Sequence, residues 1–243
     1  MSAVHTYALA LGDDALILAQ RLGEWVSNAP QLEEDVAIGN IALDLLGQAR
    51  LLLSYAGEAD GRSEDDLAFL RDEREFTNLQ IVEHPNEDFA VTIARQLVFS
   101  TYQLGLYERL QHSSDETLAG IAAKAVKEVD YHRDHATQWT LRLGDGTEES
   151  HARMQAGLAR IWPYVDEMFR PVLATTPDWA VDPGELRAEW ASYVERVLAE
   201  ATLSVPETWT APGGGRNGMH TQPFGLLLAE LQHLHRSHPG ASW

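Results

Sequence analysis

The residues of this sequence that could do chemistry are a histidine and a few carboxylates at helical spacing. A helical bundle holds a di-iron centre with one Glu or Asp on each of two helices and a Glu-x-x-His pair on each of the other two. Residues three or four positions apart share a helix face, so both members of such a pair reach the same metals. The question is which side chains stand at these positions here.

The second predicted helix offers almost no ligand at its inward pair. That pair is Leu45 and Gln48, and neither side chain is a good iron ligand. Asp44 is adjacent but rotated by about 100° from the buried stripe. We interpret Gln48 as a polar group satisfied inside the bundle. The first and third predicted helices place no carboxylate cleanly inward, and at matching depth they carry Ala15, Leu18, Leu97 and Thr101.

The fourth predicted helix keeps one ligand type. Its inward pair is Val129 and His132, and Glu128 lies four residues before His132. A lone inward histidine lacks the partners that a metal needs, so we favour a core histidine bonded to a neighbour such as Gln48 or Glu128. We predict no catalytic residue, no cofactor and no metal site in this chain. The alternative is a metal-binding oxidoreductase that uses Asp44, Glu128 and His132 in an unusual geometry.

Long amphipathic helices must position these residues. Apolar residues recur at spacings of three and four, with little period-two alternation, which predicts an all-α, ferritin-like four-helix bundle with additional C-terminal helices. The first four helices are predicted at about 4–25, 33–58, 87–104 and 114–143, and three more at about 149–169, 182–197 and 223–236. We expect a single domain over 1–243, with the core bundle at about 4–143 and the extra helices and a Gly-rich arm at about 149–243.

Two further features raise a second alternative, an acyl-CoA-binding module. The Gly-rich segment 211–218 includes Arg216 and could bind a phosphate, although we favour a flexible loop or a partner-clasping arm. Lys124, Lys127 and Arg133 form a small basic strip, which we interpret as a solvated helix face. Most tryptophans of the second half are expected in the core, with one or two at an interface: Trp139, Trp162, Trp179, Trp190 and Trp209.

The composition excludes several classes of function. The 243 residues include 37 acidic and 18 basic side chains, a net charge of -19. Such a surface repels nucleic acid and anionic membranes and attracts basic partner surfaces. The chain has no cysteine, so disulfides, thiolate zinc sites and Cys-ligated iron–sulfur clusters are excluded. The N-terminal residues do not resemble a secretory signal, and no apolar stretch is expected to approach the roughly 20 residues of a membrane span. We expect a cytoplasmic protein.

Several motifs spread over nearly the whole chain resemble one family, the noncatalytic ferritin-like structural subunits of bacterial phenylacetyl-CoA epoxidases. They are LGEW at 22–25, NAPQLE at 28–33, NIALDLLGQAR at 40–50, FLRDER at 69–74, KAVKEVDYH at 124–132, ATLSVP at 201–206 and GMHT at 218–221. Each motif alone is weakly specific, and together they are specific.

The resemblance implies a role in aerobic phenylacetate degradation, within a multicomponent monooxygenase that epoxidises the ring of phenylacetyl-CoA. The catalytic subunit of such an enzyme is a related ferritin-like bundle, which holds the di-iron site and binds the substrate, while a reductase supplies electrons from NADPH. Its Glu-x-x-His pairs correspond to Leu45/Gln48 and Val129/His132 here. The resemblance therefore implies a structural subunit that is not itself catalytic, with the catalytic ferritin-like subunit as its partner. We expect the two to meet through a large helix face, and the chain alone to self-associate through the same apolar face as a homodimer.

Overall fold

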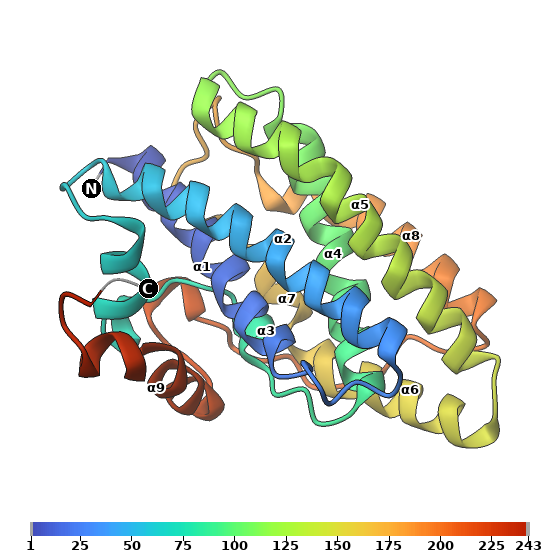
Figure 1. Cartoon of the computed structure of the whole chain (residues 1–243). Helices are drawn as coiled ribbons and strands as arrows, with labels where there is room; N and C mark the ends of the chain where they lie inside the picture. Colours follow the sequence, from blue (N-terminus) through green and yellow to red (C-terminus); the bar gives the residue numbers. More distant parts are fainter. Residues whose placement is uncertain (1, 242–243) are drawn as a thin grey trace. The chain divides into compact units, whose positions relative to one another are not determined.

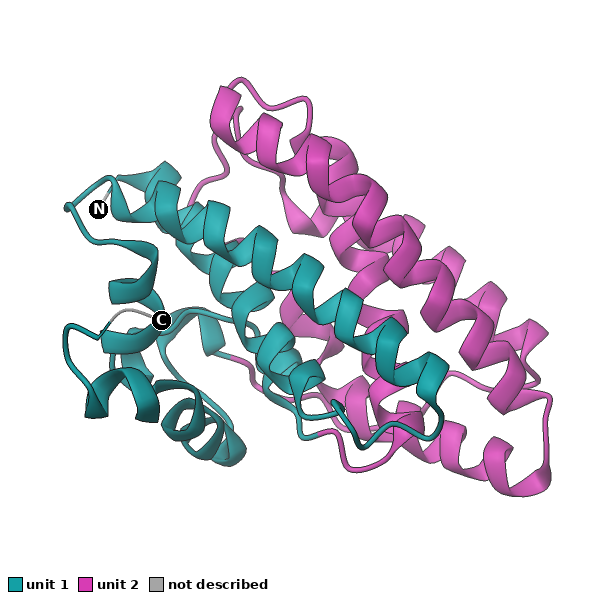
Figure 2. Cartoon of the chain, in the orientation of Figure 1, with its two compact units in different colours: residues 1–85, 214–243 teal, residues 86–213 magenta. Residues whose placement is uncertain are grey.

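The computed structural model describes residues 2–241, and within that range it contains helices and no strand (Figure 1). This confirms the predicted all-α, ferritin-like class. The chain forms two compact units, of residues 1–85 with 214–243 and of residues 86–213 (Figure 2). Each unit is built on one pair of long helices. The expectation of a single domain stays a prediction.

Unit 1 combines the N-terminal hairpin with the C-terminal helix. Its elements are α1 (Ala3–Gly23), α2 (Leu32–Gly57), the π-helical turn η1 (Asp66–Leu70), η2 (Glu73–Glu75), α3 (Gln80–Glu83), η5 (Gly215–Asn217) and α9 (Gln222–Ser237). α1 is buried on nearly every face from Tyr7 to Leu22, and α2 packs along it. The approach is close at Gly12, where a Cβ atom would lie 2.9 Å from the Leu53 side chain.

α2 corrects one sequence-based expectation. Its length and apolar composition are sufficient for a membrane span, whereas no such stretch was expected. Core helices of folded domains meet the same criterion. One stripe of α2, including Ile41, Leu45 and Leu52, is buried, and we interpret α2 as a helix that packs on the core of unit 1 with one face.

Unit 2 is continuous in sequence. Its elements are α4 (Phe89–Leu110), α5 (Glu116–Gly144), α6 (Glu148–Ile161), η3 (Trp162–Tyr164), α7 (Val165–Met168), η4 (Pro183–Leu186) and α8 (Arg187–Glu200). α4 is its central helix and contacts α5, α6 and α8.

Capping residues fix several helix starts in unit 2. Asp115 accepts a hydrogen bond from the Leu118 N–H at 2.9 Å and so caps α5; the sequence offers Ser114 and Asp115 as the two candidates. Asp182 likewise caps the turn that leads into α8. The helix predicted at 149–169 is instead divided, because Pro163 has no N–H to continue the α-helical ladder and a 3₁₀ turn separates α6 from α7.

Candidate functional site

The four positions of the metal template are buried. Leu45 and Gln48 lie on α2 in unit 1, and Val129 and His132 lie on α5 in unit 2. The carboxylates beside them, Asp44 and Glu128, are half-buried. Each of the four side chains is therefore buried within its own unit.

The donor set at these positions does not fit a di-iron centre. Leu45 and Val129 have no donor atom, and an amide such as Gln48 is a weak substitute for a carboxylate. Within residues 2–241, no three His, Cys, Asp or Glu side chains gather where they could hold a metal ion. No reaction step can be derived through iron on this chain's residues.

Two buried carboxylates on α1 correct the expectation that this helix points no carboxylate inward. Asp13 and Asp14 are both almost fully inaccessible. Arg71 forms a two-point ion pair with Asp13, and one of the two contacts is 3.0 Å. The Thr77 N–H and hydroxyl also donate to Asp13, at 2.8 and 3.0 Å. Asp13 therefore fixes the segment that follows η1 against α1.

Asp14 makes the second buried ion pair, with Arg216. The two guanidinium nitrogens approach the Asp14 carboxylate at 2.9 and 2.6 Å, and the Leu79 N–H donates to it at 2.7 Å. Burial raises the pKa of Asp14 to about 6, although the charge and hydrogen bonds of Arg216 oppose this. Arg216 also donates to the carbonyl oxygens of Ala10 and Thr77.

The contacts of Arg216 determine the conformation of the Gly-rich segment. Residues 214–218 are not the expected flexible loop, because Arg216 anchors them to α1. A Cβ atom on Gly215 would lie 2.1 Å from the Asn78 carbonyl oxygen, so only glycine permits this close approach. Gly218 has a φ of +72° and meets the Arg74 carbonyl in the same way. A guanidinium committed to Asp14 is a poor phosphate ligand.

A third buried carboxylate, Glu83 at the end of α3, binds the start of the C-terminal segment. His220 Nδ1 lies 2.6 Å from one Glu83 oxygen, and the Thr221 N–H and hydroxyl each donate to the other at 2.7 Å. His220 Nε2 lies 3.0 Å from the Phe76 carbonyl oxygen. Both ring nitrogens face acceptors, so the arrangement suits a protonated imidazole. Burial alone would lower the pKa of His220, but the hydrogen bond and charge of Glu83 outweigh it and raise that pKa.

The basic strip is only partly available to a ligand. Lys124 and Lys127 are exposed, as expected for a solvated face. Arg133 instead pairs with Asp130 at 2.9 Å and lies over the Tyr193 ring at 4.5 Å, which joins α5 to α8. The strip therefore gives little support to a phosphate site.

An exposed apolar groove in unit 1 is the feature that sequence reasoning missed and that most resembles a binding surface. On α2, apolar residues at three- and four-residue spacing point outward, opposite the buried stripe. Leu32 is 75% exposed, Leu43 65% and Val36 57%. With the facing side of α1, Phe69 and Leu231 they line a groove of about 740 Å³. Large exposed apolar patches mark interaction sites in soluble proteins. The signal was present in the sequence, because α2 is apolar on two faces.

Comparison with known proteins places the chain in a family. The family model of phenylacetic acid catabolic proteins matches residues 1–243, so the chain belongs to this family. Over the full length of both proteins it is 46% identical to the subunit designated C in the 1,2-phenylacetyl-CoA epoxidase of Escherichia coli K12. The resemblance drawn from the motifs is confirmed, and with it the assignment to phenylacetate catabolism.

Proposed function

We propose that this chain is a noncatalytic structural subunit of a multicomponent di-iron monooxygenase that epoxidises the ring of phenylacetyl-CoA. Its role is to bind and support the catalytic subunit. The observation that carries the proposal is the chemistry of the buried template positions: Leu45 and Val129 cannot ligate iron. The full-length similarity to a subunit of the Escherichia coli epoxidase supports it. The proposal includes a cytoplasmic location and no cofactor in this chain.

The apolar groove supplies a surface for the partner. Leu32, Val36 and Leu43 are too exposed to stabilise the isolated chain, and burial of such side chains contributes about 1.5–3 kcal/mol each. An apolar helix face of the catalytic subunit is the matching occupant. When the chain is alone, the same groove is expected to cover the groove of a second copy and give a homodimer.

Coexpression with the catalytic subunit tests the proposal directly. We expect the two chains to copurify, and iron quantitation to place the metal on the catalytic chain, with none on this one. Two irons bound stoichiometrically to the pure isolated chain would overturn the noncatalytic assignment and favour the metal-binding alternative. Failure to copurify would overturn the supporting role.

A charge introduced into the groove tests the surface. Leu43→Glu is expected to weaken binding of the catalytic subunit about 100-fold, within the range seen when a central interface side chain is lost. It should also shift the isolated chain from dimer to monomer in sedimentation equilibrium. Leu226→Glu is the matched control, since Leu226 on α9 is 74% exposed and lies outside the groove. Equal effects of the two variants would exclude the groove as the interface.

A further inference from the structure

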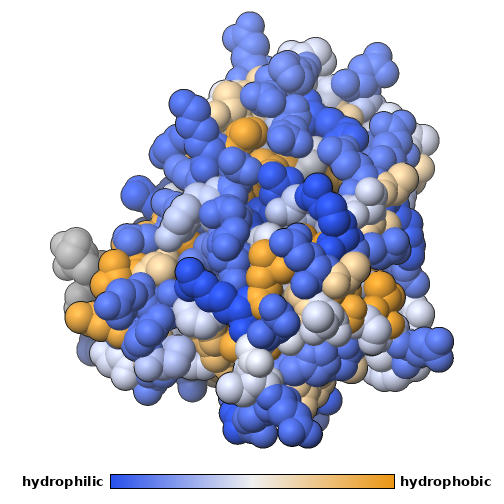
Figure 3. Space-filling model, turned by 90° about the vertical axis from the view of Figure 1, so that its right-hand side faces the viewer, coloured by the Kyte–Doolittle hydropathy of each residue, from blue (hydrophilic) through white to orange (hydrophobic). Residues whose placement is uncertain are grey.

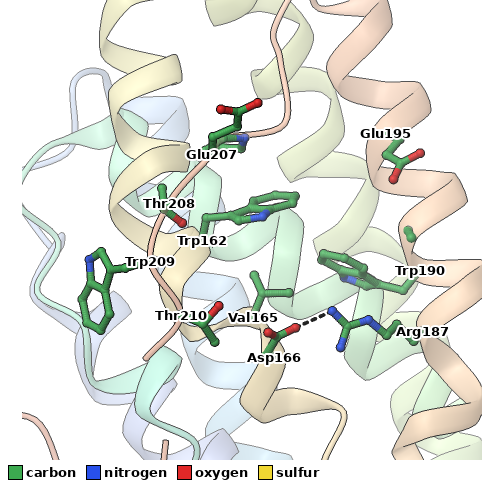
Figure 4. Close-up of a pocket in the computed structure, with 12 residues that line it drawn as sticks. Trp162, Val165, Asp166, Arg187, Trp190, Glu195, Glu207, Thr208, Trp209 and Thr210 are labelled. Carbon is green, nitrogen blue, oxygen red and sulfur yellow. Dashed lines mark hydrogen bonds and ion pairs between the residues drawn. The ribbon is translucent and has the colours of Figure 1, made fainter. Parts of the chain in front are cut away.

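Unit 2 contains a second hollow that the proposed function does not use. It lies between α8, the η3–α7 segment and the connection at 206–210, and it encloses about 760 Å³ (Figure 4). The connection has no regular secondary structure and runs as an extended chain past Trp162. The hollow is open to solvent, so a ligand could enter without rearrangement of the helices.

The inner wall of the hollow is aromatic and fixed. Trp190 is buried and donates its indole N–H to the Val98 carbonyl oxygen at 2.9 Å, which sets the ring orientation. Trp162 lies against it, with ring centroids 5.9 Å apart and planes tilted by 42°. This spacing is direct ring contact and leaves no room for a group between the rings. A ligand therefore meets the half-buried face of Trp162, with Trp190 behind it.

The charges around the hollow are predominantly negative. Arg187 forms an ion pair with Asp166 and lies over the Phe169 ring at 5.1 Å, so its charge is already committed. Glu195 on α8 and Glu207 on the connection also line the hollow. Neither carboxylate forms an ion pair or hydrogen bond with any residue of the range 2–241. Two uncompensated carboxylates beside an indole favour an organic cation and disfavour phosphates or carboxylates.

The connection at 206–210 has main-chain N–H and C=O groups that are available for hydrogen bonds. Ser204 is held by Gln155 at 2.9 and 3.0 Å, and the Ala211 N–H donates to the Pro163 carbonyl oxygen at 2.9 Å. Between these anchors, the main chain of residues 205–210 forms no hydrogen bond to other described residues. A segment fixed at both ends with unpaired main-chain groups can accept a second extended chain beside it.

We propose that this hollow binds an arginine or lysine side chain from an extended, basic segment of a partner protein. The cationic group rests on the Trp162 face between Glu195 and Glu207, and the partner main chain runs beside residues 205–210. The net charge of -19 favours the approach of such a partner. The face of the molecule in Figure 3 is mostly hydrophilic, with smaller apolar patches between the polar side chains. Trp209, 64% exposed on the same connection, adds an aromatic side chain of the kind enriched at interfaces.

A blocked five-residue peptide with a central arginine, Thr-Val-Arg-Val-Thr, tests the proposal on the full-length chain. Its matched control carries citrulline, which keeps the shape and removes the charge. Titration followed by tryptophan fluorescence and calorimetry is expected to show the arginine peptide binding at least tenfold more tightly, with a steep loss at high salt. Equal affinities of the two peptides would overturn the proposal. So would the absence of binding by either peptide at 10 mM, which corresponds to a binding free energy weaker than about -3 kcal/mol.

Variants locate the site and identify the source of the cation. The double variant Glu195→Gln, Glu207→Gln is expected to weaken binding of the arginine peptide about tenfold, because it removes two partly exposed ion pairs with the peptide cation. Glu200→Gln, an exposed acid on α8 outside the hollow, should change affinity less than twofold. Unchanged affinity in the double variant would place the binding elsewhere. If arginine amide bound as tightly as the peptide, the hollow would be a small-amine site and the polypeptide partner would be wrong.

Discussion

The two compact units are built on similar helix pairs, yet the balance between buried charge pairs and aromatic contacts differs in how their remaining segments are held. In unit 1 the C-terminal segment is joined to residues 1–85 by two buried charge pairs, Asp14 with Arg216 and Glu83 with His220, and a ring contact between Phe76 and Phe224 accompanies them. In unit 2 the joins are aromatic. Trp190 contacts Phe169 at 5.2 Å between ring centroids, and Phe169 contacts Tyr102 on α4 at 5.9 Å.

The difference follows from chain connectivity. Unit 2 is continuous, so its helices follow one another along the chain, and nondirectional apolar contacts suffice. Unit 1 joins residues 1–85 to residues 214–243, and nothing local sets how these two stretches meet. Paired charges accept few geometries, and they are costly to bury unless matched. We infer that the buried pairs set the register of the returning segment in unit 1.

The largest expected effect comes from removing one partner of the Asp13 pair. Arg71→Met leaves Asp13 buried without its counter-charge and is expected to lower the free energy of unfolding by about 3–5 kcal/mol. Arg153→Met is the control in unit 2, because the ion pair of Arg153 with Glu149 is exposed and its loss should leave the free energy of unfolding almost unchanged. Urea unfolding measures both values.

A companion variant separates charge from packing. Adding Asp13→Asn to Arg71→Met removes the unpaired charge and should recover part of the lost stability. No recovery would assign the loss to the Arg71 side chain itself, whose guanidinium also lies 4.0 Å from the Phe76 ring centroid. In the Arg71→Met variant, hydrogen exchange should accelerate more in peptides from α1 than in peptides from α6.

Unit 2 should instead be sensitive to volume. A Cβ atom on Gly157 of α6 would lie 2.9 Å from the Ala90 carbonyl oxygen, so Gly157→Ala forces two helix backbones apart. We expect a loss of about 1–3 kcal/mol. Gly120→Ala on α5 is the matched control of opposite sign, because its Cβ would meet no atom within 4 Å and alanine favours helix by about 0.5–1 kcal/mol. Urea midpoints moving the same way in both variants would contradict this account of the α6 contact.

The helices and the buried faces of α2 and α5 could be predicted from sequence, because spacing along one helix is a local property. Leu45 and His132 are buried where the stripes placed them. The division of the helix at 149–169 could also have been predicted, because a proline at position 163 interrupts an α-helix.

The buried charges could not be predicted from local patterns. Asp13 and Asp14 interrupt an otherwise apolar stretch, and this pair of acidic residues was the only local indication that carboxylates are buried on α1. Their burial is tolerable only because of Arg71 and Arg216, and Arg216 is 202 positions away from Asp14. The glycines around Arg216 suggested flexibility, whereas their smallness permits contact with Asn78 and Arg74.

The smallest expected effect concerns pH, and it tests the Glu83–His220 contact of unit 1. The raised pKa of His220 means that its protonated form contributes stability below the ordinary value of about 6.5, and this contribution is lost as pH rises through the folded-state pKa. His220→Gln should flatten that decline, with an effect of about 1 kcal/mol, the net worth of one hydrogen bond.

Asp14, with its pKa at about 6, acts in a lower pH window, since its contribution to stability is lost as pH rises from about 4 to 6. His233→Gln, an exposed histidine on α9, controls for general charge effects. Unfolding free energies measured from pH 6 to 8 decide the matter: parallel curves for His220→Gln and His233→Gln would remove His220 from the account of how unit 1 is held together.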